Sequence, residues 1–292
     1  MDKYASCLRN SLPHIAPIEN HREREKGVLV YPVYSRRSGG LSAGINLFPG
    51  YKSCPFDCPY CEVFPFAANA VFSLEQMEHD LRSAIAAALG QNMPVKDICF
   101  SGNGEPSLSL DFPPALKRAG SIRDEMVPSA ELVLISNGAG LLQPALFSLL
   151  RAAAALNIWL KLDAGTPEWY QAVNRAAIPF EKLITRIKEF TACAPVTLQT
   201  MLCAVDGKAP PEEEARAWET LVLELAATAD KSAGSGIRKV QIYGKARPAP
   251  EDPKAAALPA CYLEKRAASL RRAFMAANTA AKIPMPPIEV YP

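Results

Sequence analysis

The chain has 292 residues, of which 49% are hydrophobic and 21% charged, and its formal net charge at pH 7 is +2. These values are ordinary for a globular protein with a substantial core, and the length suits one large α/β domain or two small ones. A charge so close to neutral gives no support for a nucleic-acid partner. No stretch reaches the roughly 18 unbroken apolar residues that a membrane helix needs, so we expect no membrane partner.

The N-terminal residues 1–13 mix charged and polar side chains and lack the apolar run of a secretory signal. The sequence also contains eight cysteines. Cysteines without a secretory signal indicate metal binding or catalysis in a reducing compartment rather than a disulfide framework. We therefore expect a cytoplasmic protein.

Residues 1–40 are predicted to form an N-terminal extension, and residues 41–292 the core. The extension begins with a polar arm and continues into a strand at 27–34, which Pro32 confines to a sheet edge. A second strand, at 42–48, leads directly into a loop that holds three cysteines.

Beyond this loop, a helix is predicted at 73–89, because Ser73 and Gln76 have the spacing of a capping box and Gly90 follows. Apolar strands are then predicted at 97–101, 132–136, 158–163, 196–202, 239–243 and 288–291, helices at 114–126, 141–156, 180–193, 212–229 and 260–280, and a proline-rich connector at 248–259. Alternation of this kind predicts an α/β fold with a parallel sheet covered by helices. Six such units favour a partial (β/α)6 TIM-like barrel over a closed eight-fold one.

The cysteine loop is the most informative motif. Cys54, Cys58 and Cys61 are spaced as C-x3-C-x2-C, with two prolines between them. Three thiolates that converge on a four-iron cluster leave one iron without a protein ligand, whereas electron carriers usually have four cysteine ligands. An open coordination position is a place for chemistry. The alternative is a zinc site completed by a remote histidine or cysteine.

This spacing, with Tyr60 directly before the third cysteine, resembles the loop of radical S-adenosylmethionine (SAM) enzymes. The resemblance implies a [4Fe-4S] cluster on Cys54, Cys58 and Cys61, with S-adenosyl-L-methionine bound to the free iron. It implies that an electron from the cluster cleaves SAM to methionine and a 5′-deoxyadenosyl radical, which abstracts hydrogen from a substrate. A one-electron donor such as flavodoxin or ferredoxin would deliver the electron to the cluster. Tyr60 would contact the adenine of SAM.

A glycine-rich turn follows the second core strand and contains Gly102, Asn103, Gly104 and Glu105. The glycines allow a ligand to approach the backbone closely, and the carboxylate of Glu105 can accept hydrogen bonds from an ammonium group. An ordinary tight turn is the alternative. The segment resembles the glycine–glycine–glutamate motif of radical SAM enzymes, which holds the amino group of SAM.

Polar residues also follow the third and fourth core strands, at the strand ends where parallel α/β proteins bind ligands. They are Ser136 and Asn137, which could instead cap a helix, and Lys161 and Asp163. Alternation along a strand puts Lys161 and Asp163 on the same side. Such a pair is costly unless it is partnered or serves a ligand. Resemblance to glycyl-radical-activating and related radical SAM enzymes implies that all four residues contact the ribose or carboxylate of SAM.

Three further positions are candidates for the site. Gln199, on the fifth core strand, is added to the expected SAM contacts. Asn174 and Arg175 lie in the loop after the fourth strand, where a substrate could be met. Arg175 could bind a carboxylate or phosphate, or it could be a surface arginine.

The segments Gly-Ile-Asn-Leu-Phe-Pro-Gly and Ser-Gly-Asn-Gly-Glu-Pro resemble the wyosine-synthetase-like group of radical SAM proteins. The archaeal members act on tRNA and hold a second cluster on N-terminal cysteines, but only Cys7 precedes the loop here. We therefore predict a radical SAM enzyme for a small-molecule or modified-nucleoside substrate. One alternative is an activase that installs a glycyl radical on a protein partner. The other is a non-enzymatic zinc or iron–sulfur binding module.

Overall fold

The structure is a computed structural model that describes residues 27–63, 65–229, 234–249, 254–281 and 283–292. The predicted polar arm, residues 1–26, lies outside the described residues. The chain forms two compact units. The first contains the described residues up to Cys54 together with Val63–Ile135, and the second contains Pro55–Glu62 and Ser136–Pro292. Cys54 therefore belongs to the first unit, and Cys58 and Cys61 belong to the second.

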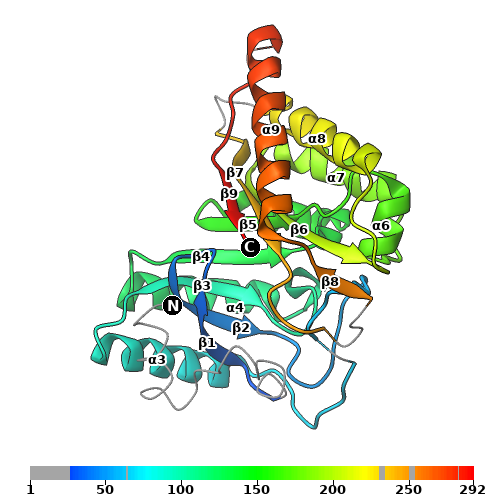
Figure 1. The fold of residues 1–292 in the computed structure, drawn as a ribbon. Helices are drawn as coiled ribbons and strands as arrows, with labels where there is room; N and C mark the ends of the chain where they lie inside the picture. The colour runs from blue at the N-terminus through cyan, green and yellow to red at the C-terminus, as the bar shows by residue number, and fades with distance from the viewer. Residues whose placement is uncertain (1–26, 64, 230–233, 250–253, 282) are drawn as a thin grey trace. The chain divides into compact units, whose positions relative to one another are not determined.

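Strands and helices alternate along both units (Figure 1). In chain order the elements are β1 (Val30–Ser35), β2 (Gly40–Asn46), α3 (Leu74–Gly90), β3 (Val95–Ser101), the 3-10 helix η2 (Pro106–Leu108), α4 (Phe112–Met126), β4 (Glu131–Ser136), the 3-10 helix η3 (Ala139–Leu142), α5 (Pro144–Ala152), β5 (Leu156–Lys161), α6 (Pro167–Val173), α7 (Phe180–Thr191), β6 (Pro195–Val205), α8 (Glu212–Ala227), β7 (Gly236–Gly244), β8 (Ala255–Ala257), α9 (Ala260–Ala281) and β9 (Ile288–Tyr291). The predicted alternation is therefore confirmed in the described residues.

In the first unit, β2, β3 and β4 are parallel, and β1 pairs antiparallel with β2 as a hairpin. Every residue of β2 is buried, and α3 packs on the sheet and on α4. The hydroxyl of Ser73 caps α3 by accepting a hydrogen bond from the backbone N–H of Gln76 at 3.2 Å. The Gln76 side chain donates forward to Asp80 at 2.8 Å, one helical turn along the same exposed surface. The Ser73 half of the predicted capping box therefore forms, whereas the Gln76 side chain is directed to Asp80.

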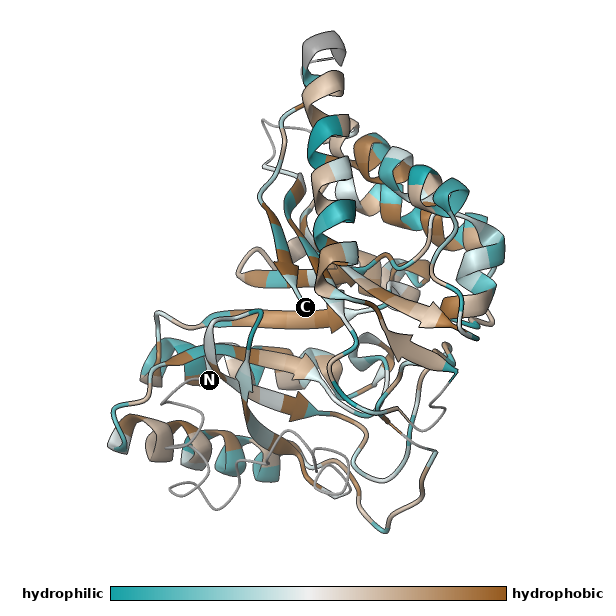
Figure 2. Cartoon of the chain, in the orientation of Figure 1, coloured by the Kyte–Doolittle hydropathy of each residue, from teal (hydrophilic) through white to brown (hydrophobic). Residues whose placement is uncertain are grey.

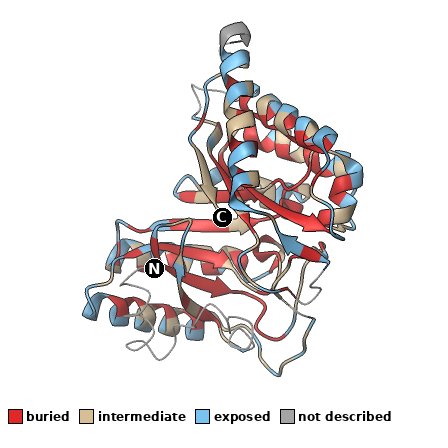
Figure 3. Ribbon diagram, in the orientation of Figure 1, coloured by how far each residue is buried: buried red, intermediate tan, exposed pale blue. Residues whose placement is uncertain are grey.

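In the second unit, β5, β6, β7 and β9 are parallel, and the short β8 pairs antiparallel with the end of β6. Helices α8 and α9 pack on β7 and on each other. The strands of both units are largely apolar (Figure 2) and buried (Figure 3). No helix among the described residues is long and apolar enough to cross a membrane.

The predicted helix at 141–156 is wrong in its bounds. Gln143 has an extended backbone (φ −95°, ψ 118°), as a residue before proline prefers, so η3 and α5 are separate. Residues from Leu156 onward already belong to β5. Two short elements escaped prediction: α6 lies in a predicted loop, and β8 lies in the predicted proline-rich connector.

Candidate active site

In the first unit, the residue before Cys54 lies against the glycine-rich turn. The N–H of Ser53 donates to the carbonyl of Asn103 at 3.0 Å, and the N–H of Glu105 donates to the carbonyl of Ser53 at 2.8 Å. A Cβ atom on Gly104 would lie 1.9 Å from that Ser53 carbonyl oxygen. The close backbone approach that Gly104 permits is therefore made by the chain of the cysteine loop itself.

The side chains of this turn are also engaged. The Asn103 amide donates to the carbonyl of Phe48 at 3.1 Å, which ties the turn to the segment that leads to the cysteines. Gly102 has a φ of +111°, a conformation that favours glycine. The Oε1 atom of the buried Glu105 accepts from the N–H and hydroxyl of Ser107 at 3.2 and 2.6 Å. These bonds fix the direction of the carboxylate.

In the second unit, the cysteine loop is held by the turn that follows α6. The N–H of Cys61 donates to the carbonyl of Cys58 at 3.0 Å, which closes a tight turn. The N–H of Asp57 donates to the carbonyl of Asn174 at 3.0 Å. Cys54, Cys58 and Cys61 form no disulfide, and each residue is partly exposed. At Cys58, burial of the thiol group raises the pKa to about 11.

Asp163 is the centre of a buried polar network beside Cys58. Its carboxylate accepts hydrogen bonds from the Tyr60 hydroxyl, from the Asn174 amide at 2.9 Å and from the N–H of Met201 at 2.8 Å. The ammonium of Lys161 lies 3.2 Å from the same carboxylate. Strand alternation predicts that Lys161 and Asp163 lie on the same side, and the structure pairs the two, although Asp163 lies two residues beyond the end of β5.

Lys161 is surrounded by aromatic side chains. Its ammonium contacts the hydroxyl of Tyr243 and lies 5.0 Å from the ring centroids of both Tyr60 and Tyr243. Burial lowers the pKa of Lys161, but the charge of Asp163 and the contact with Tyr243 outweigh it, and the net shift is upward. Burial, followed by the charge of Asp163, raises the pKa of Tyr60. The ammonium is therefore kept charged and the phenol neutral.

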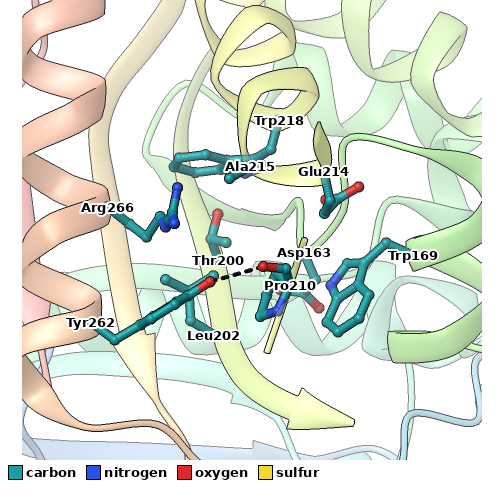
Figure 4. A pocket seen from close by; sticks show the side chains of 10 residues that line it. All are labelled: Asp163, Trp169, Thr200, Leu202, Pro210, Glu214, Ala215, Trp218, Tyr262 and Arg266. Carbon is teal, nitrogen blue, oxygen red and sulfur yellow. Dashed lines mark hydrogen bonds between the residues drawn. The ribbon is translucent and has the colours of Figure 1, made fainter. Parts of the chain in front are cut away.

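Residues of α8 and β6 also support the backbone just after the end of β5. A small cavity there, drawn in Figure 4, lies among residues of α6, α8, β6 and α9. The Trp218 indole and the Thr200 hydroxyl both donate to the carbonyl of Leu162, at 3.1 and 2.8 Å. The backbone between Lys161 and Asp163 is thus anchored by α8 and β6, and Asp163 itself lines the same cavity.

The other predicted contacts lie on neighbouring strand ends. Ser136 and Asn137 each accept a hydrogen bond from a backbone N–H two residues ahead, at 3.0 Å. Both side chains thus shape the turn into η3. Gln199 is fully buried and donates to Gln241 at 2.8 Å, and its Oε1 atom has no hydrogen-bond partner among the described residues. Arg175 lies 3.8 Å from the carboxylate of Asp57.

Sequence reasoning placed Asn174 only near a substrate and missed its contact with the cysteine loop. Its amide nitrogen lies 3.5 Å from the sulfur of Cys58. The two residues are 116 positions apart, so no local pattern could have indicated the contact. Among the residues that the structure describes, no three histidine, cysteine or carboxylate side chains are grouped as a metal site. The cysteine triad therefore stays a prediction from the motif.

No family model matches the chain. A UPF0026 protein from Helicobacter pylori (strain ATCC 700392 / 26695) is 29% identical over 164 residues, which cover 54% of this chain and 48% of that protein. A UPF0026 protein from Synechocystis sp. is 29% identical over 182 residues, or 59% of this chain and 63% of that protein. The chain thus spans about half the length of the H. pylori relative it matches.

Several solved structures share the fold. A radical SAM methyltransferase from Sphaerobacter thermophilus gives a TM-score of 0.63 at 14% identity, over 90% of this chain and 69% of that one. Streptococcus suis SuiB bound to the precursor peptide SuiA gives 0.56 at 13% identity, over 82% and 47%. TYW1 with a bound lysine-pyruvate adduct gives 0.52 at 14% identity, over 79% and 73%. The predicted fold class, a partial TIM-like α/β barrel, is confirmed, and it is a fold that radical SAM enzymes use.

Proposed function

We propose that this protein is a radical SAM enzyme in which Cys54, Cys58 and Cys61 hold a [4Fe-4S] cluster. The observation that carries the proposal is the C-x3-C-x2-C loop following β2 in a chain whose fold matches a radical SAM methyltransferase. When bound, such a cluster supplies the electron that cleaves SAM reductively. Residues 41–292 would form the catalytic core, residues 1–40 an extension, and a flavodoxin or ferredoxin the electron source.

The donor set suits an iron–sulfur cluster. All three sulfurs belong to cysteines that form no disulfide, and cysteine thiolates are the usual protein ligands of iron–sulfur clusters. The Asn174 amide already points a donor at the sulfur of Cys58, as outer-shell partners do for metal-bound thiolates. The protein's part in the chemistry is to hold the cofactor, orient it and exclude water.

For SAM, we propose two groups of contacts. In the first unit, Glu105 and the backbone of Gly102, Asn103 and Gly104 would meet the amino end, and the support is the buried, oriented carboxylate of Glu105. Because the Asn103 amide and the Gly104 backbone already contact the protein, we assign the amino group mainly to Glu105.

In the second unit, Tyr60 would contact the adenine, and Lys161 and Asp163 the carboxylate or ribose. Their support is the buried ion pair at the end of β5. Gln199 offers an acceptor that is buried and unpartnered in the described part of the chain, as expected of a group awaiting a ligand. Ser136 and Asn137 are proposed as weaker contacts on the ribose side, because their oxygens already accept backbone hydrogen bonds.

The substrate we propose is a small molecule or a modified nucleoside, with the wyosine-like group still a prediction from the two motifs. One similar structure holds a peptide and another a lysine-pyruvate adduct, so this fold admits ligands of different size. An activase that acts on a protein partner is the alternative. Copurification of a partner enzyme together with a glycyl-radical signal would favour the activase.

The test is SAM cleavage by the reconstituted protein. The chain is purified anaerobically, loaded with iron and sulfide, reduced with dithionite and incubated with SAM, and 5′-deoxyadenosine is measured by chromatography. We expect cleavage by the wild type, none by Cys58→Ala, and wild-type cleavage by Cys261→Ala, whose cysteine is exposed on α9. A colourless, zinc-loaded wild type after strictly anaerobic purification would instead favour the binding module.

A further inference from the structure

The turn after α6 is shaped to hold the cysteine loop. Two backbone hydrogen bonds join the segments: Asp57 to the carbonyl of Asn174 at 3.0 Å, and Ala177 to the carbonyl of Pro55 at 3.1 Å. Between them, Arg175 has a φ of +45°, which is unfavourable for a residue with a side chain. Strained backbone of this kind persists where the surrounding structure imposes it, and it is concentrated at functional sites.

The Asn174 side chain reaches from this turn to the ligand residue itself. It is 2% exposed, and its amide nitrogen lies 3.5 Å from the sulfur of Cys58, 2.9 Å from Asp163 and 3.3 Å from the hydroxyl of Tyr60. An amide nitrogen carries two hydrogens. One is directed to the Asp163 carboxylate, and the second is shared between the sulfur of Cys58 and the hydroxyl oxygen of Tyr60.

We propose that Asn174 is a positioning residue for Cys58, and that its N–H···S hydrogen bond raises the reduction potential of the cluster. This inference rests on the proposed function. Reduction adds negative charge, part of which resides on the cysteine sulfurs, and a hydrogen-bond donor stabilises that charge. Because Asn174 is buried, water does not compete for the donor and the bond is strengthened.

The same amide connects two parts of the site. Through it, Cys58 is linked to Asp163 and hence to Lys161, the residues proposed to meet SAM. A change that moved Asp163 would also move the donor at the sulfur. Asn174 therefore couples the position of the cluster ligand to that of the SAM contacts.

A redox titration of the reconstituted full chain tests the inference. Asn174→Leu removes the donor and keeps a similar volume, and Asn157→Leu is the matched control, because Asn157 lies on β5 and accepts a hydrogen bond from Thr197. At the potential that half-reduces the wild-type cluster, we expect the ratio of reduced to oxidised cluster in Asn174→Leu to fall about tenfold. For a one-electron couple that is a downward shift of about 59 mV. Asn157→Leu should titrate as the wild type does.

A second measurement starts from the wild type, so it can be decided even if Asn174→Leu does not fold. Reduced wild-type protein grown on ¹⁵N-asparagine should show hyperfine coupling between the cluster and an asparagine nitrogen. The coupling should disappear in Asn174→Leu and persist in Asn157→Leu. A four-iron cluster without that coupling, or with an unchanged potential in Asn174→Leu, overturns the role of Asn174 and leaves the proposed function standing. A wild type that assembles no four-iron cluster overturns the proposed function itself.

Discussion

The backbone N–H of Met201 donates to the carboxylate of Asp163 over 2.8 Å and joins the residues that follow β5 to the neighbouring strand β6. The same buried carboxylate also accepts hydrogen bonds from Tyr60 and Asn174 and pairs with the ammonium of Lys161. One side chain therefore organises the cysteine loop, the turn after α6 and two strand ends. The stability of this part of the second unit should therefore depend strongly on Asp163.

Asp163→Ala should lower the free energy of unfolding by about 3–5 kcal/mol, the usual cost of breaking a buried ion pair by removing one partner. The loss arises because the Lys161 ammonium is left without its carboxylate. Only 15% of the Lys161 side chain is exposed, so water cannot fully replace that partner. Urea unfolding followed by circular dichroism measures the change.

The double variant Lys161→Met, Asp163→Ala separates the ion pair from the rest of the network. Without a stranded ammonium, the loss caused by Asp163→Ala should be smaller by about 0.5–3 kcal/mol in the Lys161→Met background. Losses that simply add would show that the ion pair does not stabilise the protein.

Gly104→Ala should destabilise the first unit and reduce the iron bound per chain after reconstitution. Its new methyl would lie 1.9 Å from the backbone carbonyl of Ser53, next to Cys54, and backbone cannot move aside cheaply. Overpacking of this kind costs about 1–3 kcal/mol. Thermal unfolding and iron analysis measure the two effects.

Gly90→Ala is the matched control for Gly104→Ala. Gly90 is the last residue of α3, and a Cβ there would meet nothing within 4 Å. Alanine favours a helix more than glycine does, so the change should be neutral or stabilising by up to about 1 kcal/mol. Equal effects of the two substitutions would refute the steric explanation.

The pair of Glu212 and Arg266, which joins α8 to α9, should make stability depend on pH. The hydrogen bond from Arg266, 2.9 Å long, is the main reason why the pKa of Glu212 falls from 4.5 to about 2. Because the pKa is lower in the folded state, the stabilisation is complete above pH 4.5 and is lost as the pH falls towards 2.

Glu212→Gln should accordingly flatten the decline of the melting temperature over this acidic range. The neighbouring exposed Glu213→Gln is the control and should retain the wild-type decline. The comparison uses differential scanning calorimetry of the three proteins in one buffer series. Parallel curves for Glu212→Gln and the wild type would contradict the assignment.

The sequence was sufficient for the features that depend on local pattern. Alternation predicted Lys161 and Asp163 on the same side, where they form an ion pair, and the Ser73 cap of α3 formed where its spacing predicts. The short helix α6 also had a local signal that went unused: Thr166 accepts a hydrogen bond from the N–H of Trp169, and Pro167 occupies the first helical position.

Other features depend on contacts that no local pattern encodes. The strand β8 exists because its residues pair with the end of β6, and proline-rich composition gave no hint of that partner. The contact of Asn174 with Cys58 depends on how the turn after α6 packs on the cysteine loop. The sequence predicts a close backbone approach at Gly104, but it does not show that the approaching group is the backbone carbonyl of Ser53.

We propose above all that the cysteine loop holds a cluster to which SAM binds. Its most direct test is electron paramagnetic resonance of the anaerobically reconstituted, reduced protein with and without SAM. We expect a reduced four-iron signal whose shape changes when SAM is added. A signal indifferent to SAM, or no cluster signal at all, would contradict it and point to a metal-binding module.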